Sequence, residues 1–204
     1  MKRLLILPFT FGLVLSCGEQ TSKDAISELQ NDGESLSDIY MTEVKFNDAL
    51  VSEATLIDLE FYKILDLDEK NVPESQFRAE LDSSLGILDK IDLNLSVVDP
   101  SFSGGATFLT AMKDLSLKSR TLIQFYIKNV TILSKTENDW TEEELDNFNT
   151  DYGTIFDAYS DANDNVIVTQ EKFASLNNME LFENTDYDAE AIYNNSTQEE
   201  TENN

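Results

Sequence analysis

Apolar residues recur at steps of three and four along four long stretches of the chain. This spacing places side chains on one face of an α-helix. The stretches predict helices from about Ser37 to Leu65, from Pro73 to about Asp99, from about Ala106 to Ser134, and from Thr141 onwards. At about 1.5 Å per residue, the longer helices approach about 40 Å, a length that suits a helix bundle.

The apolar face of each predicted helix is expected to form the core. In the first two helices this face consists of Phe46, Leu50, Ala54, Ile57, Phe61 and Ile64, and of Phe77, Leu81, Leu85, Leu88, Ile91 and Leu95. In the third it consists of Phe108, Met112, Leu115, Ser119, Tyr126, Val130 and Leu133. Because the connection at 101–105 is short, the third helix must run antiparallel to the second. We therefore predict an all-α fold, an up-down-up-down four-helix bundle with long antiparallel helices.

Polar residues and prolines mark the ends of these helices. Ser35 and Asp38 form a plausible capping box ahead of the first helix. Pro73 suits the first turn of the second helix, because proline lacks the N–H that a first turn leaves unpaired. The second helix should end at Asp99-Pro100, since a proline disfavours helix in the residue before it.

The fourth helix has the clearest start. Thr141 and Glu144 have the spacing of a capping box, and Trp140 is positioned to pack against Leu145 as a hydrophobic staple. Its apolar stripe consists of Phe148, Tyr152, Ile155, Phe156 and Tyr159, and resumes with Phe173, Leu176 and Leu181. The poor helix formers at 161–165 interrupt the stripe, so the last helix is either bent or divided, and we favour a bend.

The first 17 residues have the pattern of a secretory signal. Lys2 and Arg3 precede an apolar run from Leu4 to Leu15, which is too short to span a bilayer. Ser16 and Cys17 follow this run. In this segment the chain resembles the bacterial lipoproteins, whose signal ends in a lipobox with a small residue before an obligatory cysteine.

The resemblance implies that the Cys17 thiol receives a diacylglyceryl group and that the protein is anchored to a membrane of the cell envelope. In enteric bacteria an aspartate after the cysteine tends to retain a lipoprotein at the inner membrane. Gly18 occupies this position here, which favours the outer membrane. We therefore divide the chain into a signal peptide (1–16), a lipidated cysteine with a polar tether (17–34), a helical bundle (35–182) and an acidic tail (183–204) that is expected to be disordered.

The charge of the chain narrows the range of partners. Removal of Lys2 and Arg3 with the signal lowers the 14 basic residues to 12, against 40 acidic residues, which is a net charge of −28. Such a field repels nucleic acid, so we expect no nucleic-acid partner. The chain contains no histidine, and Cys17 is the only cysteine. These absences exclude nucleophilic systems that need histidine, the usual zinc sites and disulfides, so we expect no cofactor.

One acidic segment resembles a calcium-binding EF-hand loop. Asp161, Asn163 and Asn165 alternate as oxygen ligands would, and Glu171 is the candidate for the closing carboxylate. However, Val166 occupies the position of the turn glycine, and the loop ending at Glu171 is one residue short. A kink in the fourth helix or an acidic solvated face explains the same residues, and we favour that interpretation.

The third helix is the basic one. Lys113, Arg120 and Lys135 lie nearly opposite its apolar face. The favoured interpretation is a solvated stripe that attracts acidic neighbouring helices, and the alternative is a binding strip for an acidic partner.

These features leave three function classes. The first is a non-enzymatic envelope lipoprotein whose bundle binds an unknown protein or small-molecule partner. The second is a small-ligand or calcium-binding lipoprotein. The third is a carboxylate-based hydrolase, which would need two acids facing each other across a cleft. We favour the first class, with no catalytic residue.

Overall fold

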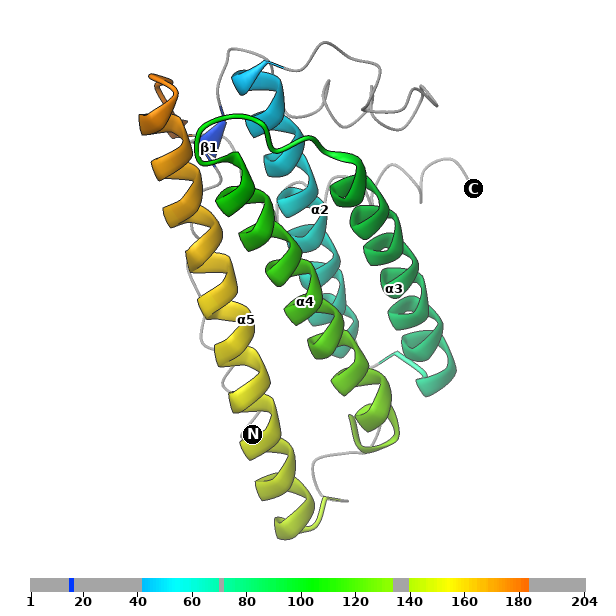
Figure 1. Ribbon diagram of the computed structural model, residues 1–204. Coiled ribbons are helices and arrows are strands. Elements are labelled where there is room, and N and C mark those ends of the chain that lie inside the picture. The colour runs from blue at the N-terminus through cyan, green and yellow to red at the C-terminus, as the bar shows by residue number, and fades with distance from the viewer. Residues whose placement is uncertain (1–14, 17–41, 70–71, 134–139, 184–204) are drawn as a thin grey trace.

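The computed structural model describes residues 15–16, 42–69, 72–133 and 140–183 of the chain. Its helices are α2 (Glu43–Glu69), α3 (Glu74–Val97), α4 (Gly105–Leu133) and α5 (Glu142–Leu176). Two short strands, β1 (Leu15–Ser16) and β2 (Phe182–Glu183), pair antiparallel. The helices run up, down, up and down (Figure 1), so the predicted four-helix bundle is confirmed.

Helix α4 lies between α3 and α5, and α2 packs against α3 and α4 from behind in the view of Figure 1. Aromatic rings also join α2 to α5. The rings of Phe46 and Phe173 lie 5.0 Å apart at one end of the bundle, and those of Phe61 and Tyr159 stack at 5.3 Å near its middle. Burial of each large apolar side chain contributes about 1.5–3 kcal/mol. The side chains of all four helices therefore form one continuous core.

The predicted core positions of the first three helices are confirmed except that Leu85 and Leu133 are only half-buried at its edge. The core is also wider than predicted. On α4 it includes Leu109, Ala111, Leu122, Ile123 and Phe125 as well. These residues flank the predicted stripe, and they are buried because α4 has neighbours on three sides.

The predicted helix ends agree with the structure to within a few residues. Helix α2 continues to Glu69, beyond the predicted end at 65, because Leu67 is still buried in the core. Pro73 is the N-cap of α3, one residue before the helix begins. The predicted start at Ser37 and the capping box of Ser35 and Asp38 lie outside the described residues.

The capping box of α5 is confirmed. The Glu144 N–H donates to Thr141 Oγ1 at 3.1 Å, and the Thr141 N–H donates to Glu144 Oε2 at 3.0 Å. Trp140 packs edge-on against Phe148, with ring centroids 5.5 Å apart, whereas Leu145 is exposed. Trp140 thus makes its aromatic contact one turn beyond the residue predicted for the staple.

Helix α5 runs without interruption through 161–165, so the last helix is not divided. Ala162 and Val166 are buried on its inner face, which keeps this segment helical although its Asp and Asn residues are poor helix formers. The helix ends at Leu176, which is exposed, so the prediction that Leu176 faces the core is wrong. The residue lies in the last turn, beyond Phe173 and Ala174, the last buried positions of the helix.

The connection between α3 and α4 ends in two glycines, Gly104 and Gly105, and other residues would not fit well at either position. Gly104 has a φ of +78°, a conformation that other residues rarely adopt. A side chain on Gly105 would meet the Pro100 carbonyl oxygen at 3.0 Å and the Phe46 ring at 3.3 Å. In contrast, a side chain on Gly86 in the middle of α3 would meet nothing within 4 Å.

These surroundings predict opposite effects for two identical substitutions. Gly86→Ala should raise the free energy of unfolding by about 0.5–1 kcal/mol, because glycine inside a helix loses more backbone entropy than alanine. Gly105→Ala should lower it by about 1–3 kcal/mol, because the new methyl group overpacks a closed contact. Chemical denaturation of both variants measures the difference, and equal effects would contradict the packing described at Gly105.

Candidate functional site

The two described residues of the predicted basic strip lie on α4 and have different surroundings. Lys113 is exposed. Arg120 instead reaches α3, where its Nη2 lies 2.9 Å from Asp89 Oδ1 and 2.7 Å from Asp92 Oδ2. Lys135, the third predicted residue, lies outside the described residues. The structure therefore places Lys113 at the surface and Arg120 in an ion-pair cluster between α3 and α4.

This cluster fixes α3 against α4. Ser116 Oγ of α4 donates to Asp92 Oδ1 at 2.6 Å, and Asp92 Oδ2 accepts from Arg120. Partial burial lowers the pKa of Arg120, but its hydrogen bonds and charge interactions with Asp92 and Asp89 outweigh this effect and raise the pKa overall. Arg120 consequently acts first as an interhelical contact, as the favoured interpretation of the strip expects.

Three large apolar side chains are exposed around this cluster. They are Leu93 and Val97 of α3, which are 65% and 47% exposed, and Leu117 of α4, which is 56% exposed. Leu93 and Leu117 directly follow Asp92 and Ser116, which are in contact, so the two leucines lie at the same level of neighbouring helices.

Val97 and Lys113 lie one helical turn from Leu93 and Leu117, respectively. Because α3 and α4 are antiparallel, these two turns lead toward the same end of the bundle. We call Leu93, Val97, Lys113 and Leu117 the α3–α4 face. It combines exposed apolar surface with a positive charge, and Asp89, Arg120 and Asp92 hold its two helices in register.

The residues considered for calcium do not form a loop. Asp161, Asn163 and Asn165 lie two residues apart on the continuous helix α5, so each side chain is rotated about 200° around the helix axis from the previous one. An EF-hand needs these oxygens to converge around a turn. Among the described residues no group of three or more acidic, histidine or cysteine side chains could hold a metal ion. Glu171, the candidate closing ligand, is exposed on the same helix.

Helix α2 carries two buried carboxyl groups that the sequence did not reveal. Glu53 is 5% exposed and Asp58 is 2% exposed. Burial raises the pKa of each to about 7, and the hydrogen bonds from Asn94 to Glu53 and from Tyr159 to Asp58 offset this only in part. The only sequence signal for them is position, because each is adjacent to a core residue, Ala54 or Ile57. Positions beside a stripe are buried only where a neighbouring helix covers them.

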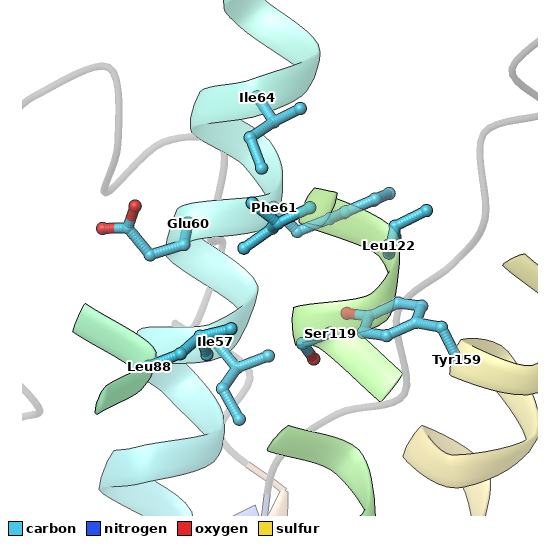
Figure 2. Close-up of a pocket in the computed structure, with 9 residues that line it drawn as sticks. Ile57, Glu60, Phe61, Ile64, Leu88, Ser119, Leu122 and Tyr159 are labelled. Atoms are coloured by element: carbon cyan, nitrogen blue, oxygen red, sulfur yellow. The ribbon is translucent and has the colours of Figure 1, made fainter. Parts of the chain in front are cut away.

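A small cavity lies near the middle of the bundle, between α2, α3, α4 and α5 (Figure 2). It is lined mainly by apolar side chains, together with Glu60, Ser119 and Tyr159. Figure 2 shows the Glu60 carboxylate pointing away from Tyr159, and Glu60 accepts instead from Ser84 of α3. The cavity has room for about one water molecule, so it does not fit an organic ligand.

The cluster between α3 and α4 gives a testable stability effect. Asp92→Ala should lower the free energy of unfolding by about 1–2 kcal/mol, because the buried Ser116 hydroxyl and Arg120 both lose an acceptor. Asp82→Ala, at an exposed position of the same helix, is the matched control and should change it by less than about 0.5 kcal/mol. Denaturant titration of both variants measures the difference, and an equal loss in both would show that Asp92 is no more important than a surface aspartate.

No family model, no curated protein and no solved structure matches this chain. Within the described residues, none of the helices has both the length and the apolar character to cross a membrane.

Proposed function

We propose that this protein is a lipid-anchored protein of the bacterial envelope whose helical bundle acts as a non-enzymatic binding module. The anchor is the diacylglyceryl group implied for Cys17, and Gly18 after this cysteine favours the outer membrane. The bundle binds its partner through the α3–α4 face. The expected partner of the α3–α4 face is a protein whose surface combines apolar side chains with an acidic group.

The observation that carries this proposal is the exposure of Leu93, Val97 and Leu117 around one interhelical cluster. Exposed apolar residues that gather on one face are typical of protein interaction sites, whereas single exposed ones need no explanation. Lys113 adds a charge that can pair with an acidic group of the partner and orient it. The ion pairs of Arg120 keep α3 and α4 in place, so the face is pre-organised for binding.

The two other function classes have less support. A small-ligand protein needs a pocket, and the described cavity holds about one water molecule. A carboxylate-based hydrolase needs two acids that face each other across a cleft. Glu53 instead contacts α3 through Asn94, whereas Asp58 contacts α5 through Tyr159, so the two buried acids lie on different sides of α2.

The lipid anchor is tested by Cys17→Ser in the producing bacterium. The substitution removes the thiol that would receive the lipid, so the protein should shift from the membrane fraction to the soluble fraction or remain as uncleaved precursor. Cell fractionation with immunoblotting, together with mass spectrometry of the mature N-terminus, measures this. A variant that is processed normally and stays in the membrane fraction would contradict lipidation.

The binding face is tested by photocrosslinking in intact cells. A photoreactive amino acid at Leu117 should give a defined adduct, because this position lies within the α3–α4 face. The matched control is Val168 on α5, which is 60% exposed but lies outside this face. Gel analysis followed by mass spectrometry identifies the adducts. Identical adducts from both positions, or none from Leu117, would contradict the proposed face.

The charge and shape of the α3–α4 face are tested in the same crosslinking assay, with the photoreactive amino acid placed at Leu93. Lys113→Glu together with Leu117→Asp should lower the yield of the adduct at least about tenfold, because both the positive charge and an apolar contact are lost. Both substitutions are at exposed positions, so the melting temperature should change little. Arg120 is left intact because its substitution would also disturb the contact with α3. An unchanged yield in the folded variant would contradict a role for these side chains.

A further inference from the structure

Helix α2 carries buried carboxyl groups at its junctions with two different helices. At the junction with α3, Asn94 Nδ2 donates to Glu53 Oε1 at 2.8 Å. Glu53 Oε2 is buried and has no hydrogen-bond partner among the described residues. At the junction with α5, the Tyr159 hydroxyl donates to Asp58 Oδ1 at 3.5 Å, a long hydrogen bond. Both carboxyl groups therefore rely on one neutral donor each, although they are almost completely buried.

Lys63, a cation of α2 itself, pairs with other carboxyl groups. Along the α2–α3 junction, Lys63 lies 2.9 Å from Glu80 and 3.7 Å from Glu60. Lys63 is ten residues from Glu53, which corresponds to about 15 Å along the helix. Tyr159 is the titratable group that α5 directs at Asp58.

Helix α4 contributes neutral side chains beside this part of α2, namely Ser119, Leu122 and Ile123. The guanidinium of α4, on Arg120, contacts Asp89 and Asp92 of α3. No described ion pair therefore involves Glu53 or Asp58. A buried carboxylate without a cation is costly, and protonation removes this cost.

We propose that α2 is a proton-sensitive element of the bundle: it packs firmly while Glu53 and Asp58 are protonated, and it loosens from α3 and α5 when they ionise. The two carboxyl groups act at two separate junctions, so their ionisation weakens α2 on both sides. The contacts between α3 and α4, and between α4 and α5, contain neither group. The response is therefore confined to α2 and does not depend on the binding function proposed above.

The direction of the pH effect follows from proton binding. Burial raises the pKa of both groups to about 7 in the folded protein, above the ordinary values of 3.8 for Asp and 4.5 for Glu. Between about pH 4 and pH 7 the folded protein thus holds protons that the unfolded chain has released. The stability contributed by the neutral carboxyl groups is complete below about pH 4, falls through this window and is lost above about pH 7.

Hydrogen exchange of the full chain at pH 5.5 and pH 8.0, measured by mass spectrometry, tests the proposal. After correction for the intrinsic effect of pH on exchange, the protection of α2 peptides should fall at least about tenfold from pH 5.5 to pH 8.0, since one ionising carboxyl group changes the equilibrium about tenfold per pH unit. Peptides from α4 should change much less. An equal loss of protection in α2 and α4 would overturn the proposal, because it would indicate a general effect of charge.

Substitution of Glu53 and Asp58 distinguishes their effect on the pH response from the effect of the other carboxylates. In the Glu53→Gln, Asp58→Asn double variant, the protection of α2 should no longer depend on pH, because the amides cannot ionise. The matched control is Asp82→Asn with Asp157→Asn, at exposed positions of α3 and α5, and it should keep the wild-type response.

If the double variant does not fold, the single variant Asp58→Asn is measured instead. In this variant the change in α2 protection between pH 5.5 and pH 8.0 should be smaller than in the wild type by about threefold or more. A pH response that is unchanged in folded variants lacking one or both carboxyl groups would overturn the proposal.

Discussion

The bundle depends on the way α2 packs against the other helices. Its inner face contributes Phe46 and Phe61 to aromatic contacts with α5, and these contacts close the core opposite α4. The same helix buries polar side chains beside its apolar stripe, including Asn47, which accepts a hydrogen bond from Gln170 of α5 at 2.9 Å. Paired neutral groups of this kind fix the register of two helices at little cost. The buried carboxyl groups of Glu53 and Asp58 occupy similar positions beside the stripe, and each accepts one hydrogen bond from a neutral donor, Asn94 or Tyr159.

Polar and charged side chains of α3 contact both of its neighbours, α2 and α4. On the side of α2 it presents Asn94, Ser84 and Glu80, which contact Glu53, Glu60 and Lys63 in antiparallel order. On the side of α4 it presents Asp89 and Asp92 to Arg120. Ion pairs at the surface contribute little stability individually. Those of Arg120 add to the apolar packing between α3 and α4, whereas the proposed contact of the α3–α4 face with a partner relies on exposed apolar side chains.

The candidate site was only partly predictable. Lys113 and Arg120 could be identified from the sequence, because basic residues opposite an apolar stripe must face away from that helix's own core. The sequence could not distinguish their roles, since Arg120 is engaged only because Asp89 and Asp92 of another helix lie beside it. The segment at 161–165 shows the same limit. Its composition favours a bend or a break, yet the burial of Ala162 and Val166 against other helices keeps it helical.

The sequence by itself determined the helical class, the four apolar stripes of the helices in the described residues, most of the core and the capping box at Thr141 and Glu144. These features depend on local periodicity and on contacts between residues three or four positions apart. Tertiary structure decided which flanking polar groups are buried, and hence the pKa values of Glu53 and Asp58. It also decided which apolar residues remain exposed, as at Leu93 and Leu117. Both outcomes depend on where a neighbouring helix lies, and periodicity within one helix contains no information about that position.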